Sequence, residues 1–150
     1  MNGTRQGSVL SPGLFAIYMN ELLIELRGLG VGCFVADMFM GAVGYCDDIL
    51  LLAPTRRAME IMLKCCENFA LRNNLLFSTD PDPEKSKTKC LFIRGKQKNL
   101  LPPVDLQLYG LNLPWVDSAT HLGHELTVEA TMETDDRIKR ATFILLHQAN

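Results

Sequence analysis

Two adjacent carboxylates between two short apolar runs constrain the fold of this chain more than any other feature. Asp47 and Asp48 follow an apolar run at residues 39–43 and precede another at residues 49–53. Each run has the length and composition of a buried strand. The two carboxylates therefore fall at the turn of an expected β-hairpin, where they meet solvent while the flanking strands enter a core.

The spacing of this pair alone leaves two interpretations open. Like charges in contact oppose joint ionisation, so an uncompensated pair carries a cost that a divalent cation would remove. Mg²⁺ takes oxygen ligands and commonly uses one or two carboxylates together with substrate phosphates, and two such ions can hold the attacking and leaving oxygens of phosphoryl transfer. The alternative is an ordinary turn, because aspartate tolerates turn geometry well.

Composition predicts one folded domain without an overall basic surface. The chain has 150 residues, 47% of them hydrophobic, and a formal net charge of −2. Such a chain is globular, but it does not present the positive charge usual for a nucleic-acid-binding protein, so basic residues for that role must be clustered or supplied elsewhere. From Lys85 to Lys98 six basic residues occur without an acidic one. This patch suffices for phosphate contacts, although a solvated loop would have the same composition.

The cysteines and the apolar runs limit the cellular compartments in which we expect the protein. The five cysteines form no C-x-x-C pair, and their number is odd, which argues against a zinc knuckle and a disulfide framework. Buried free thiols in a reducing compartment are the expected alternative. The N-terminus lacks a signal-peptide pattern, and no apolar run reaches the roughly 18 residues that span a membrane. We therefore expect an intracellular protein of the cytoplasm, the nucleus or both, with no membrane partner.

Two helices are expected beside the hairpin, in an α+β fold. Ser11 and Pro12 form a typical helix start, and the segment from there to Arg27 is apolar over most of its circumference, which predicts a buried helix. Thr55 is expected to cap a second, amphipathic helix that ends near Asn73. The expected apolar face of this second helix consists of Ala58, Ile61, Met62, Cys65, Cys66 and Phe69.

Short strands and turns are expected through the rest of the chain. The expected strands are residues 33–40 with a turn near Asp37, 41–45, 49–53, 75–78 and 90–93, followed by a small antiparallel arrangement at residues 106–122 around Gly110. An amphipathic helix is expected to begin at residue 133 and to continue to residue 150. His121 and His124 flank a predicted Leu122–Gly123 turn, and they lack further ligands at metal-site spacing.

Four segments, in order, resemble the sequence boxes of reverse transcriptases. Residues 45–48 (YCDD) resemble the aromatic-x-Asp-Asp box, and residues 3–15 (GTRQGSVLSPGLF) are similar to the R-Q-G-x-x-L-S-P box that precedes it. Residues 82–90 (DPEKSKTKC) resemble the next box, usually N-P-x-K-T/S-K, with Asp82 where asparagine is usual. Residues 121–123 (HLG) resemble the Leu-Gly turn that follows the palm. The set is most similar to non-LTR (LINE-type) retrotransposon enzymes and covers nearly the whole chain.

The resemblance implies a fold and a division of the chain. It implies a partial polymerase palm, in which an antiparallel sheet carries the Asp-Asp hairpin and packs on two helices. Residues 1–98 would be the palm portion, and residues 99–150 the palm-to-thumb connection with the start of the thumb. The fingers and the first palm segment would belong to the same polyprotein, upstream of this chain, which we expect to be a truncated piece.

The resemblance also implies roles for individual residues. Asp47 and Asp48 would be catalytic and would bind Mg²⁺ or Mn²⁺. Lys85 would lie near the nucleotide phosphates as a candidate general acid, with Lys87 in reserve. Other residues would contact the substrates: Arg5, Gln6, Gly7 and Tyr45 the nucleotide and template, and Leu122 and Gly123 the primer end. Without the resemblance, Gly7 and Ser8 would be no more than a turn before a helix.

The function implied is synthesis of DNA on an RNA template, with a DNA primer and dNTPs as the other partners. The resemblance implies that this chemistry needs three carboxylates. Asp47 and Asp48 would supply two of them, and the third would lie on a strand upstream of residue 1. We therefore expect the nucleotidyltransferase activity to belong to the intact protein and this chain alone to have little or none. Two alternatives stay open: a catalytically dead remnant that binds nucleic acid weakly through residues 85–98, and an unrelated α/β interaction domain with an ordinary Asp-Asp turn.

Overall fold

The protein is described by a computed structural model that places residues 11–46, 48–80, 82, 84–94, 105–128 and 140–147. Two helices and ten strands are formed by the described residues. In chain order the elements are α1 (Ser11–Gly28), β1 (Phe34–Val35), β2 (Met38–Phe39), β3 (Ala42–Tyr45), β4 (Asp48–Ala53), α2 (Arg56–Arg72), β5 (Lys89–Arg94), β6 (Gln107–Leu108), β7 (Leu111–Asn112), β8 (Ser118–His121), β9 (His124–Thr127) and β10 (Arg140–His147).

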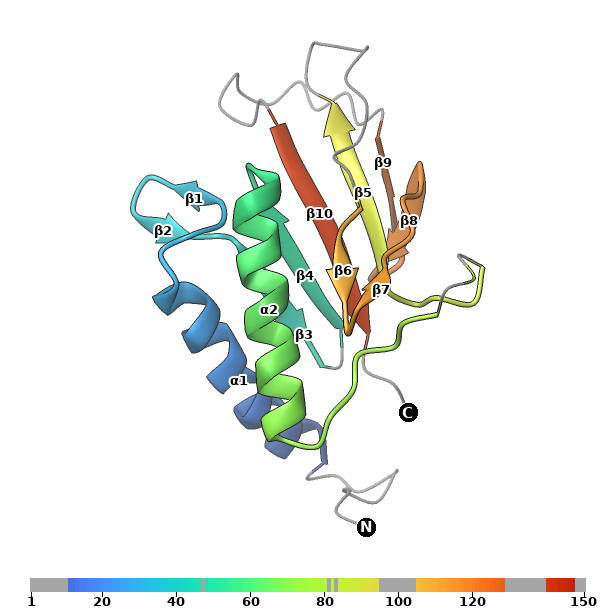
Figure 1. The fold of residues 1–150 in the computed structure, drawn as a ribbon. Helices are drawn as coiled ribbons and strands as arrows, with labels where there is room; N and C mark the ends of the chain where they lie inside the picture. The colour runs from blue at the N-terminus through green and yellow to red at the C-terminus, as the bar shows by residue number, and fades with distance from the viewer. Residues whose placement is uncertain are drawn as a thin grey trace.

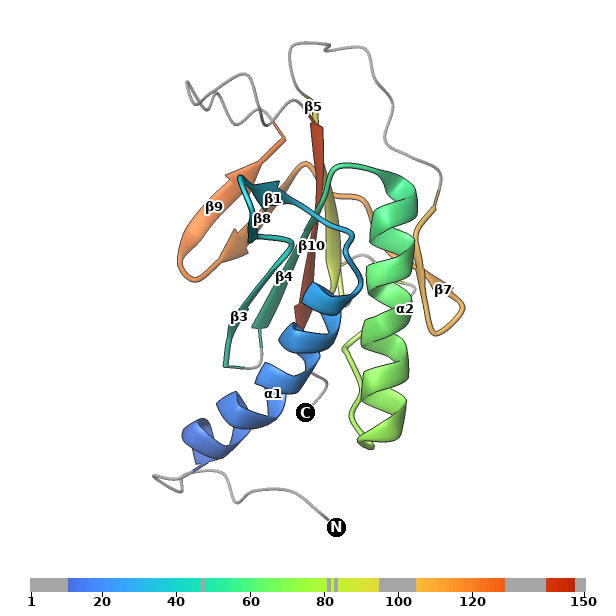
Figure 2. The ribbon, with the colours of Figure 1, turned by 90° about the vertical axis from the view of Figure 1, so that its left-hand side faces the viewer.

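A four-stranded antiparallel sheet with the order β3-β4-β10-β5 forms the centre of the fold. Helices α1 and α2 lie together on one face of this sheet (Figure 1). The β8–β9 hairpin lies on the opposite face, as the turned view makes clear (Figure 2). The expected α+β arrangement of an antiparallel sheet on two helices is therefore found, and it is consistent with a partial palm.

The side chains of strand β4 alternate between two apolar clusters, and they are buried on the helix side and half-buried on the other. Ile49, Leu51 and Ala53 are buried in the main core with both helices. Leu50 packs on the other face against Leu91, with the β8–β9 hairpin above. Full burial of each such aliphatic side chain stabilises the fold by roughly 1.5–3 kcal/mol. The strand that carries Asp48 at its start is thus held firmly in place.

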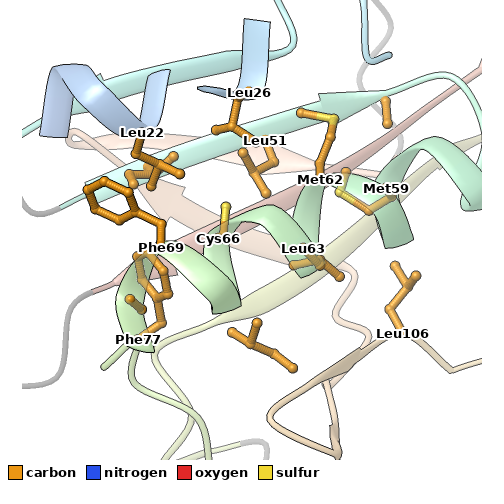
Figure 3. Packing of buried hydrophobic residues seen from close by; sticks show 14 of the residues in the cluster. Leu22, Leu26, Leu51, Met59, Met62, Leu63, Cys66, Phe69, Phe77 and Leu106 are labelled. Atoms are coloured by element: carbon orange, nitrogen blue, oxygen red, sulfur yellow. The ribbon is translucent and has the colours of Figure 1, made fainter. Parts of the chain in front are cut away.

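Helix α2 begins as the sequence predicts but turns a slightly different face to the core. Thr55 is its N-cap, and the Thr55 Oγ1 accepts a hydrogen bond from the Ala58 N–H at 3.2 Å. Ile61, expected in the core, is 37% exposed. The buried positions are Ala58, Met59, Met62, Leu63, Cys66, Phe69 and Ala70 (Figure 3). The expected face was correct at Ala58, Met62, Cys66 and Phe69, whereas Met59, Leu63 and Ala70 are buried in place of Ile61 and Cys65.

Helix α1 is only half covered, so the prediction of a buried helix is wrong for its outer face. Met19, Leu22 and Leu26 are buried against α2 and β3, whereas Ile17 and Ile24 are 70% and 61% exposed. The expected turn near Asp37 is confirmed, because β1 and β2 pair around Ala36 and Asp37 and Ala36 has a φ of 51°. Gly110 connects β6 to β7 at a φ of 75°, as predicted.

Two expected elements are wrong. Residues 75–78 form no strand of the structure, and only Phe77 makes a single bridge. Residues 140–147, expected in a helix, form β10, while residues 133–139 and 148–150 lie outside the described residues. The cause is tertiary: β10 pairs with β4 on one side and β5 on the other. The backbone bonds that these two neighbours require override the helical preference of Ala141, Leu145 and Leu146. The start of a thumb stays a prediction.

In the part of the chain that the structure describes, neither helix has the length and apolar character needed to cross a bilayer.

Candidate active site

The Asp-Asp segment lies at the connection between β3 and β4. These strands pair antiparallel with Tyr45 directly opposite Asp48, which leaves Cys46 and Asp47 as a two-residue connection. Cys46 has a φ of 52°, the positive value that the primed turns of such hairpins require. Asp47 lies outside the described residues, so the structure describes the expected carboxylate pair only at Asp48, which is half-buried.

The face on which Asp48 lies follows from the alternation of β3 and β4. A Cβ added at Gly44 would lie 3.4 Å from Leu23 Cδ1, so residue 44 faces α1. Tyr45, the next residue, therefore lies on the opposite face, and Asp48 shares that face because directly opposite residues do. Tyr45 is 61% exposed. An aromatic ring and a carboxylate thus share the helix-free side of the sheet at the hairpin end.

The conformation of Cys46 gives a first prediction. A non-glycine residue at positive φ carries a strain of roughly 1–2 kcal/mol, which glycine lacks, whereas glycine loses more entropy on folding. Cys46→Gly is therefore expected to raise the free energy of unfolding by about 0.5–1 kcal/mol in urea denaturation. Asn74→Gly is the matched control, since Asn74 has a φ of 54° and asparagine tolerates that region. A Cys46→Gly effect no larger than that of Asn74→Gly would refute the strain.

Lys85 lies in a tight turn that precedes β5. The Lys85 N–H donates to the Asp82 carbonyl at 3.0 Å, and its Nζ lies 3.2 Å from Asp82 Oδ2. Asp82, which replaces the usual asparagine of the resembled box, thus gives Lys85 an anionic partner. The pair is exposed, and exposed ion pairs contribute at most about 1 kcal/mol, so the ammonium can leave Asp82 for another anion.

The sheet separates Lys85 from the hairpin while keeping both near the same end. Leu50 of β4, Leu145 of β10 and Lys89 of β5 stand side by side in register. Because β4 and β5 run in the same direction, the segment with Lys85 enters β5 at the end of the sheet where β4 begins at Asp48. Figure 1 shows that segment beyond β5, on the side of the sheet away from β3. β10 and β5 therefore lie between the two predicted catalytic segments.

Of the other predicted site residues, the structure describes some and not others. Leu122 and Gly123 form the predicted turn, between β8 and β9, with φ values of 50° and 79°. Leu122 is 46% exposed, and its hairpin lies on the helix-free face of the sheet. Arg5, Gln6 and Gly7 lie outside the described residues. So do residues 95–98, the end of the basic patch.

Four cysteines outside the hairpin are poorly suited to nucleophilic chemistry. Burial raises the pKa of the Cys66 and Cys90 thiols well above the usual range, and it also raises the pKa of Cys33 and Cys65. These four thiols therefore stay protonated at neutral pH and are poor nucleophiles. The expectation of buried free thiols is confirmed for Cys66 and Cys90. It is wrong for Cys46, which is exposed at the hairpin turn.

The donor set at the hairpin suits a divalent cation only in part. Asp48 offers the hard oxygen donors that Mg²⁺ and Mn²⁺ prefer, and Asp47 would add two more. Among the residues that the structure describes, no group of three or more His, Cys, Asp or Glu side chains could hold a metal ion. The described residues thus fit one part of a metal site. Sequence reasoning missed β10, whose His147 stands in register with Asp48. The β-branched and aromatic residues Thr142, Phe143 and Ile144 were the available signal.

Comparison with known proteins identifies the family. The family model described as reverse transcriptase (RNA-dependent DNA polymerase) matches residues 1–126, which is most of the chain. This chain belongs to the reverse transcriptase family. Its hairpin, α2 and β5 all lie within the matched residues of this reverse transcriptase domain. No solved structure matches it.

Curated relatives of the reverse transcriptase domain are Pol polyproteins of LINE-type elements. The chain is 33% identical over 98 residues to the Pol polyprotein of retrotransposable element R2 from Nasonia vitripennis, covering 65% of the chain and 9% of the relative. It is 36% identical over 61 residues to that of R2DM from Drosophila melanogaster, covering 41% and 6%. It is 28% identical over 127 residues to that of R1 from Bradysia coprophila, covering 81% and 11%. The chain thus spans about a tenth or less of these relatives.

Proposed function

We propose that this reverse transcriptase domain contributes the Asp47–Asp48 hairpin to RNA-templated DNA synthesis by two-metal phosphoryl transfer in a longer polyprotein. The observation that carries the proposal is the pairing of Tyr45 with Asp48 at the end of the β3–β4 hairpin, within the residues matched by the family. The partners would be an RNA template, a DNA primer and a dNTP. Upstream fingers and a first palm segment of the same polyprotein would complete the enzyme.

The proposal assigns a role to each of the site residues. Asp47 and Asp48 would hold Mg²⁺ or Mn²⁺, and the ions would supply charge stabilisation of the transferring phosphoryl group. Lys85 would exchange its exposed partner Asp82 for a phosphate oxygen. Two further groups would contact the substrates: Arg5, Gln6, Gly7 and Tyr45 the nucleotide and template, and Leu122 and Gly123 the primer end.

The proposal places the complete activity in the longer protein. A metal site with Asp47 and Asp48 alone lacks the third carboxylate that we expect on an upstream strand, so the isolated chain would synthesise little or no DNA. Residues 1–98 would be the palm portion, and residues 99–150 would lead into the thumb. The unpaired cysteines support an intracellular location in cytoplasm or nucleus. A dead remnant with weak nucleic-acid binding is the alternative, although no particular contact favours it.

Divalent-cation affinity tests the proposed ligands. The double variant Asp47→Asn/Asp48→Asn is expected to bind Mn²⁺ at least about tenfold more weakly than the natural chain, because affinity follows the charge of the ligands. The matched control is Asp80→Asn/Asp82→Asn, which removes two carboxylates from the turn before β5. In that turn the Asp80 Oδ1 accepts from the Asp82 N–H at 2.8 Å, an acceptor that asparagine retains. Equal loss in both double variants would count against a specific hairpin site.

A further inference from the structure

The side chain of Lys89, the first residue of β5, lies on the helix-free face of the sheet. Side chains of a strand alternate between its two faces. Cys90 is buried in the main core with the helices, whereas Leu91 is buried in the second cluster, under the β8–β9 hairpin. Lys89 therefore shares the face of Leu91. Asp48 shares this face too, because Leu50, two residues further along β4, packs against the same cluster.

The register of the sheet sets the distance between Lys89 and the β3–β4 hairpin. Lys89 stands opposite Leu145 of β10, and Leu145 stands opposite Leu50 of β4. Asp48 lies two residues from Leu50, toward the hairpin turn. With strands about 4.8 Å apart and a rise of about 3.3 Å per residue, the Cα atoms of Lys89 and Asp48 are roughly 12 Å apart. Side chains stand roughly perpendicular to a sheet, so the ammonium and the carboxylate keep most of this separation.

Lys89 differs from the other lysines near the start of β5 in its surroundings. Lys85 and Lys87 are exposed, whereas Lys89 is half-buried. Lys85 has Asp82 as its partner, but Lys89 forms no ion pair with any residue that the structure describes. An ammonium that is partly withdrawn from water gains from an anionic partner. A phosphate supplied from outside the chain would provide that partner.

The β8–β9 hairpin indicates which strand of a bound nucleic acid would supply the phosphate. This hairpin lies on the same face of the sheet as Lys89 (Figure 2), and β8 contacts β5. Its Leu122–Gly123 turn is the segment to which we assign the primer end. Of the proposed substrates, the primer strand is therefore the polyanion that would pass closest to Lys89.

We propose that Lys89 binds a phosphate of the primer backbone near the 3′ end and thereby orients the primer toward the Asp47–Asp48 hairpin. The separation from Asp48 assigns to Lys89 a phosphate beside the reacting group, not the reacting group itself. Lysine suits this contact as a compact point charge, and a backbone contact carries no base specificity. The inference rests on the proposed function, because it takes the primer strand to lie on this face.

The salt dependence of duplex binding tests the contact. The full chain is titrated, without divalent cations, into a fluorescently labelled duplex of RNA template and DNA primer with a recessed 3′ end. Lys89→Gln is expected to weaken binding about 3–10-fold at low salt and to reduce the slope of log K against log salt by about one, because one phosphate contact is lost. Lys89→Arg should keep both the affinity and the slope.

Arg57→Gln is the matched control. Arg57 is exposed near the start of α2, which covers the opposite face of the sheet (Figure 1), and the substitution removes the same charge. It should leave the salt slope unchanged. Equal changes of slope in both variants, no change in Lys89→Gln, or no binding of the duplex by the natural chain would overturn the proposal.

A neutral linkage in the duplex covers the case in which Lys89→Gln does not fold. A single methylphosphonate removes the charge of one phosphate. The natural chain is expected to lose affinity, by a similar factor, when this linkage lies near the 3′ end of the primer and to be indifferent to it in the template. A loss confined to template linkages, or the same primer-linkage loss in Lys89→Gln, would overturn the assignment to the primer strand.

Because the duplex assay contains no divalent cation, its outcome is separable from the metal role of the hairpin. A slope change specific to Lys89→Gln, together with Mn²⁺ affinity that is unchanged in Asp47→Asn/Asp48→Asn, would refute the metal role while supporting the phosphate contact. An unchanged slope together with weakened Mn²⁺ binding would refute the phosphate contact alone.

Discussion

Replacing Phe69 by alanine is expected to lower the free energy of unfolding by about 3–5 kcal/mol. Phe69 is fully buried between the two helices, and its ring meets that of Tyr18 edge to face at a centroid distance of 5.7 Å. Truncation removes this packing and leaves a cavity that the surrounding helices fill only in part. Because α1 and α2 together cover one face of the central sheet, the truncation is expected to destabilise the whole fold.

Urea denaturation monitored by circular dichroism measures this effect. Leu71→Ala on the same helix is the matched control, because Leu71 is 57% exposed and its truncation should change stability by no more than about 0.5 kcal/mol. Similar losses in both variants would show that Phe69 does not join the two helices as the structure places it.

DNA synthesis should be the property most sensitive to the hairpin. In a longer polypeptide that includes the upstream palm strand, Asp47→Asn or Asp48→Asn is expected to reduce RNA-templated primer extension by about 10²–10³-fold, because each removes a charge that positions the metal ions. Asparagine keeps the size of the side chain, so the hairpin should still form.

The control for synthesis lies in another turn. Asp37 is exposed between β1 and β2, and Asp37→Asn should leave synthesis unchanged. Residues 1–150 alone should extend a primer little or not at all. Robust Mg²⁺-dependent synthesis by residues 1–150, or synthesis by the Asp47→Asn protein at the natural rate, would contradict these expectations.

Local signals in the sequence predicted the elements that depend on local chemistry. Ser11 with Pro12 and Thr55 marked the two helix starts, and Gly110 and Leu122–Gly123 marked turns that the structure contains. Pairing between segments that lie far apart in the sequence was not predictable in this way. Residues 140–147 contain good helix formers beside β-branched and aromatic residues, and they form a strand where they pair with two strand edges. Similarly, Ile17 and Ile24 are apolar without being buried, because the described residues leave them uncovered.

At the candidate site, too, local features were predictable from the sequence and long-range pairing was not. The apolar flanks of the Asp-Asp pair predicted a hairpin, and Tyr45 and Asp48 do pair across it. The ion pair between Lys85 and Asp82 follows from the fold of a short turn, which the sequence box alone does not specify. The register that sets His147 opposite Asp48 depends on a pairing between segments about a hundred residues apart, and no local pattern encodes it.

The location of the first Mn²⁺ ion to bind tests directly whether the Asp47–Asp48 hairpin is a metal site. Mn²⁺ broadens the NMR signals of nearby amides, so a titration of the natural chain shows where the ion binds. We predict that the amides of Tyr45 and Asp48 broaden first. Earlier broadening at Asp82 and Glu84, in the acidic turn before β5, with the hairpin amides unchanged would contradict it.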